Sequence, residues 1–238
     1  MKKLLVAALA TLAQSLVSAT VATGPYIEIS VGDGSVRTIV PVPGDGSVRV
    51  VNNGDVETWY VADFKIGDDS FDDLVFSFDP DPFIAFSVGI TKVSAGSTTY
   101  SILFGSPYVG GPYDQVSSQL QGTLDATGTS ATMTSITHTT IVDATMVLTD
   151  LMDPCSSSGP LVTCAATTAA TSYASNASGF FTSSLSFTLD APAIATFNGR
   201  SDVFASTPVP TPATLPLALL ALSGLGWTLR QRRAAPRH

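Results

Sequence analysis

The strongest constraint on the fold is a two-residue alternation of apolar and polar side chains between Thr20 and Thr207. Successive strand residues point to opposite faces of a sheet, so this period indicates half-buried β-strands. No long stretch of the region has the 3.6-residue period of an amphipathic helix. The clearest runs place one set of apolar residues on a common face: Leu74, Phe76 and Phe78; Ile84, Phe86, Val88 and Ile90; Val116, Leu120 and Leu124; Phe181, Leu185, Phe187 and Leu189. Because clusters of Gly, Pro, Asp and Asn separate the runs, the sequence predicts an all-β domain with a β-sandwich or jelly-roll-like fold.

A short repeat supports the same fold class. Gly-Asp-Gly-Ser-Val-Arg occurs at 32–37 and again at 44–49. Asp-Gly supplies the positive φ angles that tight hairpin turns need, so the repeat predicts two successive β-hairpin turns. Repeated Asp-Gly also lines calcium-binding solenoids, but two copies are too few for that architecture.

The charge of the region between the termini narrows the choice of partners. Of the eleven basic residues, only Arg37, Arg49, Lys65, Lys92 and Arg200 lie there, with all nineteen acidic residues, which gives a charge of −14. Such a surface repels phosphate backbones and anionic lipid, so no nucleic-acid partner is expected. All but two of the acidic residues are Asp, which favours turns over helix interiors.

The N-terminus has the layout of a secretory signal peptide. Lys2 and Lys3 precede an apolar run from Leu4 to Val17, and the small residues Ser18 and Ala19 follow. We expect export through the translocon and cleavage after Ala19, with Ala22 as a second choice. The signal peptide would then occupy residues 1–19.

The C-terminus combines three features in a fixed order. Val209, Pro210, Thr211, Pro212 and Ala213 precede an apolar stretch over 214–229, and the basic residues Arg230, Arg232 and Arg233 follow it. An apolar stretch of about 16 residues forms a helix of roughly 24 Å, slightly short of a typical membrane span. The arginines would keep that end in the cytoplasm, and the prolines keep the preceding segment extended.

This tail resembles the PEP-CTERM sorting signals of Gram-negative bacteria, particularly the variant with a Val-Pro-Leu-Pro-Ala motif. Thr211 stands where that variant has Leu, and no Glu is present as in the Val-Pro-Glu-Pro form. The resemblance covers roughly 30 residues and implies processing by a membrane enzyme called exosortase. It also implies an intermediate that the C-terminal helix anchors in the inner membrane, followed by transit to the cell surface or the extracellular space. The expected organisation is a signal peptide at 1–19, a secreted β-domain at 20–206 and a sorting tail at 207–238.

The two cysteines predict a disulfide. Cys155 and Cys164 are the only cysteines of a chain that we expect to be exported, and an even count in an oxidising compartment favours pairing. The segment from Thr163 to Ser178 is poor in large apolar residues, so we expect it to be a mobile or edge segment.

No set of residues has the pattern of a catalytic site. His138 is the one histidine of the predicted domain, no Gly-x-Ser-x-Gly motif is present, and a strand-surface position is expected for His138. The densest acidic region contains Asp68, Asp69, Asp72 and Asp73. These carboxylates suit calcium but do not match the EF-hand spacing, and two Asp-Asp pairs on a solvated turn need no metal, which is the favoured interpretation. No cofactor is therefore expected, with calcium as an alternative.

Two functions fit these observations. The first is a structural or adhesive, non-enzymatic protein of the envelope or biofilm matrix, made by an organism that secretes exopolysaccharide. The second is a carbohydrate-binding module associated with that exopolysaccharide, whose candidate aromatic residues for sugar rings are Trp59, Tyr60, Tyr100, Tyr108 and Tyr113. A secreted hydrolase is disfavoured by the residue inventory.

Overall fold

A computed structural model describes the central region of the chain. The described residues are 24–32, 34–42, 44, 46–79, 83–109, 111, 113–142, 145–159, 161–164, 167–172 and 178–205. The predicted signal peptide at 1–19, including the Ala19 cleavage site, lies outside them. So do the motif at 209–213 and the arginines of the tail.

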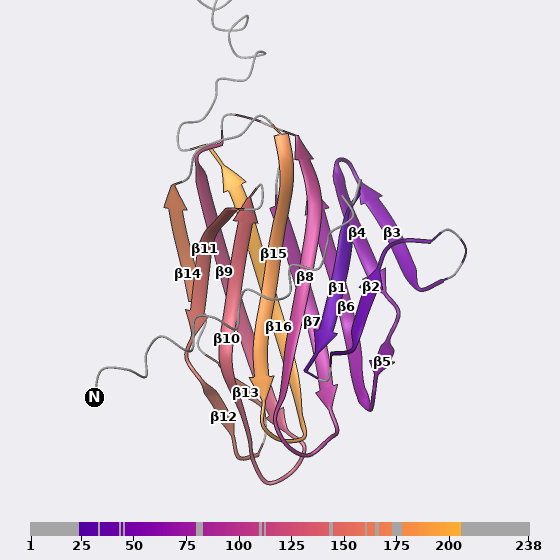
Figure 1. Cartoon of the computed structure of the whole chain (residues 1–238), viewed down its shortest axis with the longest axis vertical. Helices are drawn as coiled ribbons and strands as arrows, with labels where there is room; N and C mark the ends of the chain where they lie inside the picture. Colours follow the sequence, from indigo (N-terminus) through magenta and orange to yellow (C-terminus); the bar gives the residue numbers. More distant parts are fainter. Residues whose placement is uncertain are drawn as a thin grey trace, which may run out of the picture. The chain divides into compact units, whose positions relative to one another are not determined.

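The described residues form two antiparallel sheets (Figure 1). The seven-stranded sheet, called sheet A here, has these strands in spatial order: β11 (Thr145–Met152), β10 (Ala131–Val142), β15 (Ser178–Leu189), β8 (Thr98–Val109), β1 (Tyr26–Val31) and β2 (Val36–Ile39). The short strand β12 (Cys155–Ser157) also pairs with β10.

The second sheet, called sheet B, has nine strands. In spatial order the strands are β13 (Val162–Thr163), β9 (Gln115–Ala126), β16 (Ala193–Phe204), β7 (Phe83–Lys92), β6 (Asp69–Asp79), β4 (Val56–Val61) and β3 (Val48–Asn53). Two short strands pair off this path: β14 (Thr167–Ser172) with β9, and β5 (Phe64–Ile66) with β6.

The predicted alternation describes the core correctly. The apolar members of the four runs, from Leu74 to Leu189, are all buried in one cluster to which both sheets contribute. Aromatic rings join the sheets directly: Phe86 of sheet B stacks on Phe104 of sheet A with centroids 4.5 Å apart, and Phe187 of sheet A lies 4.5 Å from Phe197 of sheet B. The prediction of an all-β sandwich is therefore confirmed. No helix long and apolar enough to cross a membrane occurs among the described residues.

The two copies of the hexapeptide repeat have different roles. The first joins β1 to β2 as a hairpin, with Gly34 at φ 88° and a hydrogen bond of 2.9 Å from the Gly34 amide to the Val31 carbonyl. The prediction of a second hairpin at 44–49 is wrong, because β2 belongs to sheet A and β3 to sheet B. There the positive φ angles of Gly44 and Gly46 direct the chain from one sheet to the other.

Two bulges interrupt the long strands. Asp73 and Ser135 are non-glycine residues with φ near 52°, and the register of β6 against β7 and of β10 against β15 shifts around them. At the first bulge the Asp72 carbonyl approaches Gly89, where a Cβ would lie 2.8 Å from that oxygen. Glycine at 89 therefore allows β7 to follow the bulged strand.

Candidate functional site

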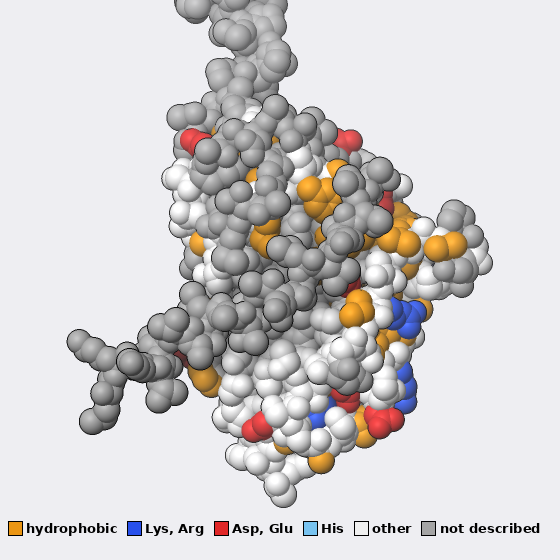
Figure 2. All heavy atoms as spheres, in the orientation of Figure 1, with side chains coloured by type: hydrophobic (Ala, Val, Ile, Leu, Met, Phe, Trp, Pro, Cys, Tyr) orange, Lys and Arg blue, Asp and Glu red, His pale blue; other side chains and the backbone are white. Residues whose placement is uncertain are grey.

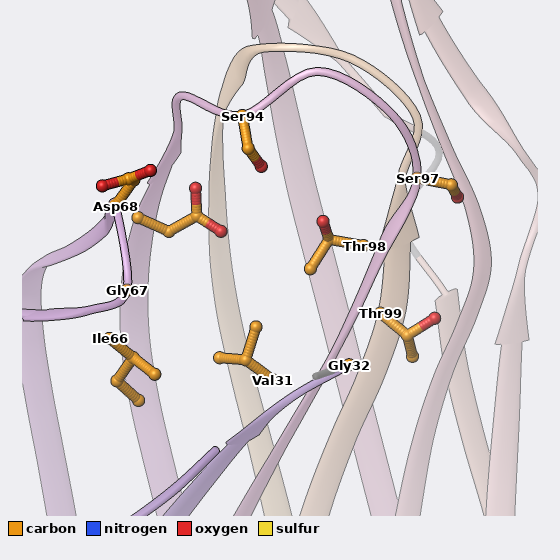
Figure 3. A pocket seen from close by; sticks show the side chains of 10 residues that line it. Val31, Gly32, Ile66, Gly67, Asp68, Ser94, Ser97, Thr98 and Thr99 are labelled. Carbon is orange, nitrogen blue, oxygen red and sulfur yellow. The ribbon is translucent and has the colours of Figure 1, made fainter. Parts of the chain in front are cut away.

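A shallow hollow lies at one end of the sandwich, where three connections meet. It is formed by the end of β1, the turn between β5 and β6 and the loop between β7 and β8, and its volume is about 530 Å³. Figure 3 shows the Ser94 and Thr98 side chains pointing into it, with Asp68 at its rim. Ser97 and Thr99 also line the hollow, so hydroxyl and carboxylate groups form the polar part of its wall.

Asp69 closes the base of this hollow and is held by two hydrogen bonds. The Tyr100 hydroxyl donates to Asp69 Oδ2 at 2.6 Å, and the Val93 amide donates to Oδ1 at 3.0 Å. Burial raises the pKa of Tyr100 above its usual value, and the hydrogen bond to Asp69 raises that pKa further. The pair therefore fastens β8 of sheet A to β6 and β7 of sheet B.

Lys92 directly precedes Val93 in the sequence and is also buried. Its ammonium group donates to the Ser94 carbonyl and to Ser94 Oγ, the latter at 3.0 Å. A buried ammonium group needs such acceptors because desolvation is costly. The contact fixes the first residues of the β7–β8 loop, which forms one wall of the hollow.

The four aspartates predicted as an alternative calcium site do not point into one space. Asp68 is exposed in the β5–β6 turn, whereas Asp69 points between the sheets. Asp72 is on the opposite face of β6 and accepts a hydrogen bond of 3.2 Å from Thr91, and Asp73 is exposed in the bulge. The described part of the chain contains no group of three or more His, Cys, Asp or Glu side chains that could hold a metal ion. A site built from all four carboxylates would require Asp69 to leave Tyr100 and Val93.

The prediction that His138 is on a strand surface is wrong, because its side chain is 0% exposed and lies between the sheets. Its Nε2 is 2.7 Å from Ser183 Oγ and 3.2 Å from Ser201 Oγ. Its Nδ1 is 3.7 Å from Asp150 Oδ2, which also accepts a hydrogen bond from Ser118. His138 therefore belongs to a polar cluster that five strands of both sheets contribute to.

The cluster has the residue types of a Ser-His-Asp triad but is enclosed by the core. His138, Ser183 and Ser201 are all completely buried, and the Phe86 ring meets the imidazole edge-to-face at 5.4 Å. A nucleophilic serine must approach a substrate to about 3 Å, and here a substrate would first have to separate the sheets. Two sets of hydrogen bonds in this cluster link the sheets: His138 and Ser183 tie β10 and β15 to Ser201 of β16, and Asp150 of β11 is tied to Ser118 of β9. The two sets meet only at the 3.7 Å approach of His138 to Asp150.

A sequence signal for this cluster exists. Every second residue of β10 from 136 to 142 faces the same side: Ile136, His138, Thr140 and Val142. The first and last of these four residues are apolar, which predicts that His138 and Thr140 lie on the buried face with them. The serine partners carry no comparable signal. Ser118, Ser183 and Ser201 lie on three other strands, and only the pairing of the sheets brings them together.

The candidate sugar-binding aromatics are not gathered on one surface. Trp59 and Tyr100 are buried in the core. Tyr60 is 39% exposed and packs under the Arg49 guanidinium, whose carbon is 4.2 Å from the ring centroid. Tyr113 is partly buried against the core, and the side chain of Tyr108 lies outside the described set.

The predicted disulfide between Cys155 and Cys164 is present, with Cα atoms 5.4 Å apart. Cys155 begins β12, which pairs with β10 of sheet A, whereas the Cys164 amide donates to the Gly122 carbonyl of sheet B at 2.8 Å. The disulfide therefore crosses between the sheets. The segment that follows contains β14, which pairs with β9 at the margin of sheet B, as the expectation of an edge segment requires.

Comparisons with known proteins leave the family open. No protein-family model matches this chain, and no curated protein matches it either.

Proposed function

We propose that this chain is an exported envelope or extracellular-matrix protein, sorted by an exosortase-type enzyme, whose β-sandwich has a structural or adhesive and non-enzymatic role. The observation that carries the proposal is the three-part tail at 209–233, in a chain that also begins with a signal-peptide pattern. A proline motif, an apolar stretch and arginines in that order form an accessible strip next to a membrane stop.

Features of the described domain support this role. The Cys155–Cys164 disulfide suits an oxidising compartment outside the cytoplasm. Hydroxyl side chains pair across neighbouring strands on the sheet surfaces, as in Thr99 with Thr188 at 2.8 Å and Thr139 with Thr149 at 3.3 Å. Such pairs stabilise strands and leave hydroxyl groups at the surface for hydrogen bonds to hydrated polymers.

The proposed route has three steps. The translocon exports the chain and the leader is removed after Ala19, the C-terminal helix holds the intermediate in the inner membrane, and the processing enzyme acts within 209–213. The released domain then reaches the cell surface or the medium. Arg230, Arg232 and Arg233 act as the stop that keeps the motif at the membrane.

The intact mass of the protein from the surface fraction of its native host tests the proposal. We expect a wild-type species that starts at Thr20 and ends within 209–213, and we expect its loss when the three tail arginines are replaced by Ala. A wild-type species that retains His238 and stays in the inner membrane would contradict sorting. An Arg37→Ala variant is the matched control, since it removes one arginine of the domain and leaves the tail intact.

A second candidate function, a carbohydrate-binding module, is favoured by the hollow in Figure 3. Its volume of about 530 Å³ and its hydroxyl and carboxylate wall suit a sugar ring better than an apolar ligand. Binding of host exopolysaccharide that is lost in Asp68→Ala but kept in Asp55→Ala would support this function. Equal binding by both variants would exclude the hollow as the site.

A further inference from the structure

Two Asn-Gly pairs occur in the chain, and the fold places them in different surroundings. Asn53 and Gly54 lie where β3 ends and the turn to β4 begins, whereas Asn198 and Gly199 lie within β16. Both asparagines are exposed, and neither side chain has a hydrogen-bond partner among the residues that the structure describes. Exposure alone therefore does not distinguish the two pairs, and the backbone around each glycine decides its chemistry.

An Asn-Gly pair can lose ammonia without an enzyme. The amide nitrogen of the glycine attacks the side-chain Cγ of the asparagine and closes a succinimide ring, and the proton of that nitrogen leaves with the departing ammonia. Water then opens the ring at either carbonyl, which gives aspartate or isoaspartate. Glycine favours the attack because it has no Cβ to obstruct the nitrogen. The asparagine backbone must leave the extended conformation for the nitrogen to reach Cγ.

The pair in β16 is held against this reaction. β16 lies between β7 and β9, and Gly199 is paired with Phe86 on one side and with Leu120 on the other. Whichever neighbour its amide faces, that amide donates within the ladder and the backbone stays extended. A Cβ at Gly199 would lie 2.1 Å from Phe86 Cζ, so the core packs directly against this backbone. Attack at Asn198 therefore requires β16 to separate from the centre of sheet B.

The pair at the end of β3 has no such restraint. Among the described residues β3 pairs with β4 alone, and this pairing ends at Asn53 with Val56. Gly54 begins the turn with a φ of 67°, and its amide makes no hydrogen bond within the described part of the chain. Nothing lies within 4 Å of a Cβ built at Gly54. Strand ends and turns open at a small free-energy cost, so the Gly54 nitrogen can approach Asn53 Cγ.

We propose that Asn53 is a site of spontaneous deamidation in the folded protein, with water as the second reactant, and that Asn198 is not. Deamidation here goes beyond the proposed function and is independent of sorting, because it needs only the β3–β4 turn and water. The isoaspartate product carries the main chain through the former side chain, which adds a carbon atom to the backbone at the end of β3. The turn then no longer matches the pairing with Val56, whereas the aspartate product keeps the hairpin.

Either product adds a negative charge at this end of sheet B. The next acidic residues are Asp55, which is exposed in the turn, and Glu57, which is partly buried on β4. The basic residues Arg37, Arg49 and Lys65 lie on β2, β3 and β5. Figure 2 shows Lys and Arg side chains beside hydrophobic ones along the margin where these strands lie. The modified chain is therefore a more acidic form of the protein, which ion exchange separates from the unmodified form.

Peptide mapping of the full chain by mass spectrometry tests the proposal. The folded protein is incubated in mildly alkaline buffer made with heavy-oxygen water and is then digested in ordinary water. The heavy label marks residues that were converted in the folded state and separates them from residues converted during digestion. We expect Asn53 to convert at least about tenfold faster than Asn198, since hairpin ends open far more readily than central strands.

The same measurement in urea is the control for the sequence around each pair. The two rates should converge there, because unfolding gives both glycine nitrogens the same freedom. Equal rates at Asn53 and Asn198 in the folded protein would overturn the proposal. Conversion of Asn53 that begins only when the chain is unfolded would overturn it as well.

Two matched variants test the acidic form directly. Asn53→Gln should abolish the acidic form that accumulates during incubation, because the longer side chain closes a ring much more slowly. Asn198→Gln removes the other Asn-Gly pair and should leave that accumulation unchanged. An acidic form that accumulates equally in both variants would refute the assignment to Asn53.

Discussion

Replacing Gly199 by Ala tests how tightly the centre of the sandwich is packed. Gly199 faces the core on β16, opposite Phe86 on β7, and a Cβ there would lie 2.1 Å from the Phe86 Cζ atom. Ordinary carbon–carbon contacts need about 3.5 Å, so the ring would have to move by more than 1 Å. Phe104 stacks on that ring at 4.5 Å and His138 meets it at 5.4 Å, and both restrict the movement.

The expected net loss is about 2 kcal/mol of unfolding free energy. Overpacking of a core costs about 1–3 kcal/mol, and the upper part of this range applies because the ring has neighbours in sheet A. The lower entropy of the unfolded alanine chain offsets roughly 0.4–1 kcal/mol of that cost. For a domain of this size, about 2 kcal/mol corresponds to a decrease in Tm of roughly 4–8 °C.

Urea unfolding followed by near-UV circular dichroism measures this loss. Gly128→Ala is the matched control, since a Cβ at Gly128 has nothing within 4 Å, and it should remain within about 0.5 kcal/mol of the wild type. Adding Phe86→Leu to Gly199→Ala should recover part of the loss, because a smaller side chain leaves room for the new methyl group. If Gly199→Ala proves as stable as Gly128→Ala, the Phe86 ring is not confined and the packing argument is refuted.

Two further predictions concern the links between the sheets. The raised pKa of Tyr100 means that its contribution to stability is complete below pH ~10 and declines as pH rises above that value. Tyr100→Phe should make this alkaline decline less steep, at a loss of about 1.5–3 kcal/mol near neutral pH. The part due to Tyr26 should remain, because burial and then Glu28 raise the pKa of Tyr26 as well. A decline as steep in Tyr100→Phe as in the wild type, in urea unfolding at a series of alkaline pH values, would contradict the assignment. Reduction of the Cys155–Cys164 disulfide should lower the free energy of unfolding by about 2–3 kcal/mol. Cys155→Ser with Cys164→Ser should match the reduced wild type, and an unfolding midpoint that is unchanged by reductant would show the prediction to be wrong.

The sequence predicts the core better than the connections. Leu74, Phe76 and Phe78 alternate with less apolar neighbours, and burial of one strand face follows from that period alone. The two copies of Gly-Asp-Gly-Ser-Val-Arg show the limit of local information. The same six residues form a hairpin at 32–37 and direct the chain between sheets at 44–49, because the outcome depends on where the next strand finds its partner.

The site was harder to predict than the fold, for a related reason. Thr137, Thr139 and Thr140 surround His138 with polar residues, so composition suggests a surface strand although the period of β10 places His138 inside. Asp69 and Asp72 are close in sequence yet lie on opposite faces of β6, with Asp73 in the bulge. Residue type alone cannot indicate which carboxylates share a space; pairing and bulges decide it.

The spatial order of the strands also determines when the domain can be completed. β15 lies between β10 and β8 in sheet A, and β16 lies between β9 and β7 in sheet B. Chains emerge N-terminus first. The edges of β8 and β10 that pair with β15, and those of β7 and β9 that pair with β16, therefore stay unpaired until residues 178–204 have emerged. The final strands thus complete both sheets at once, directly before the segment that contains the proline motif. A chain interrupted before this point lacks the centre of both sheets, so completion of the fold and delivery of the tail become nearly simultaneous events.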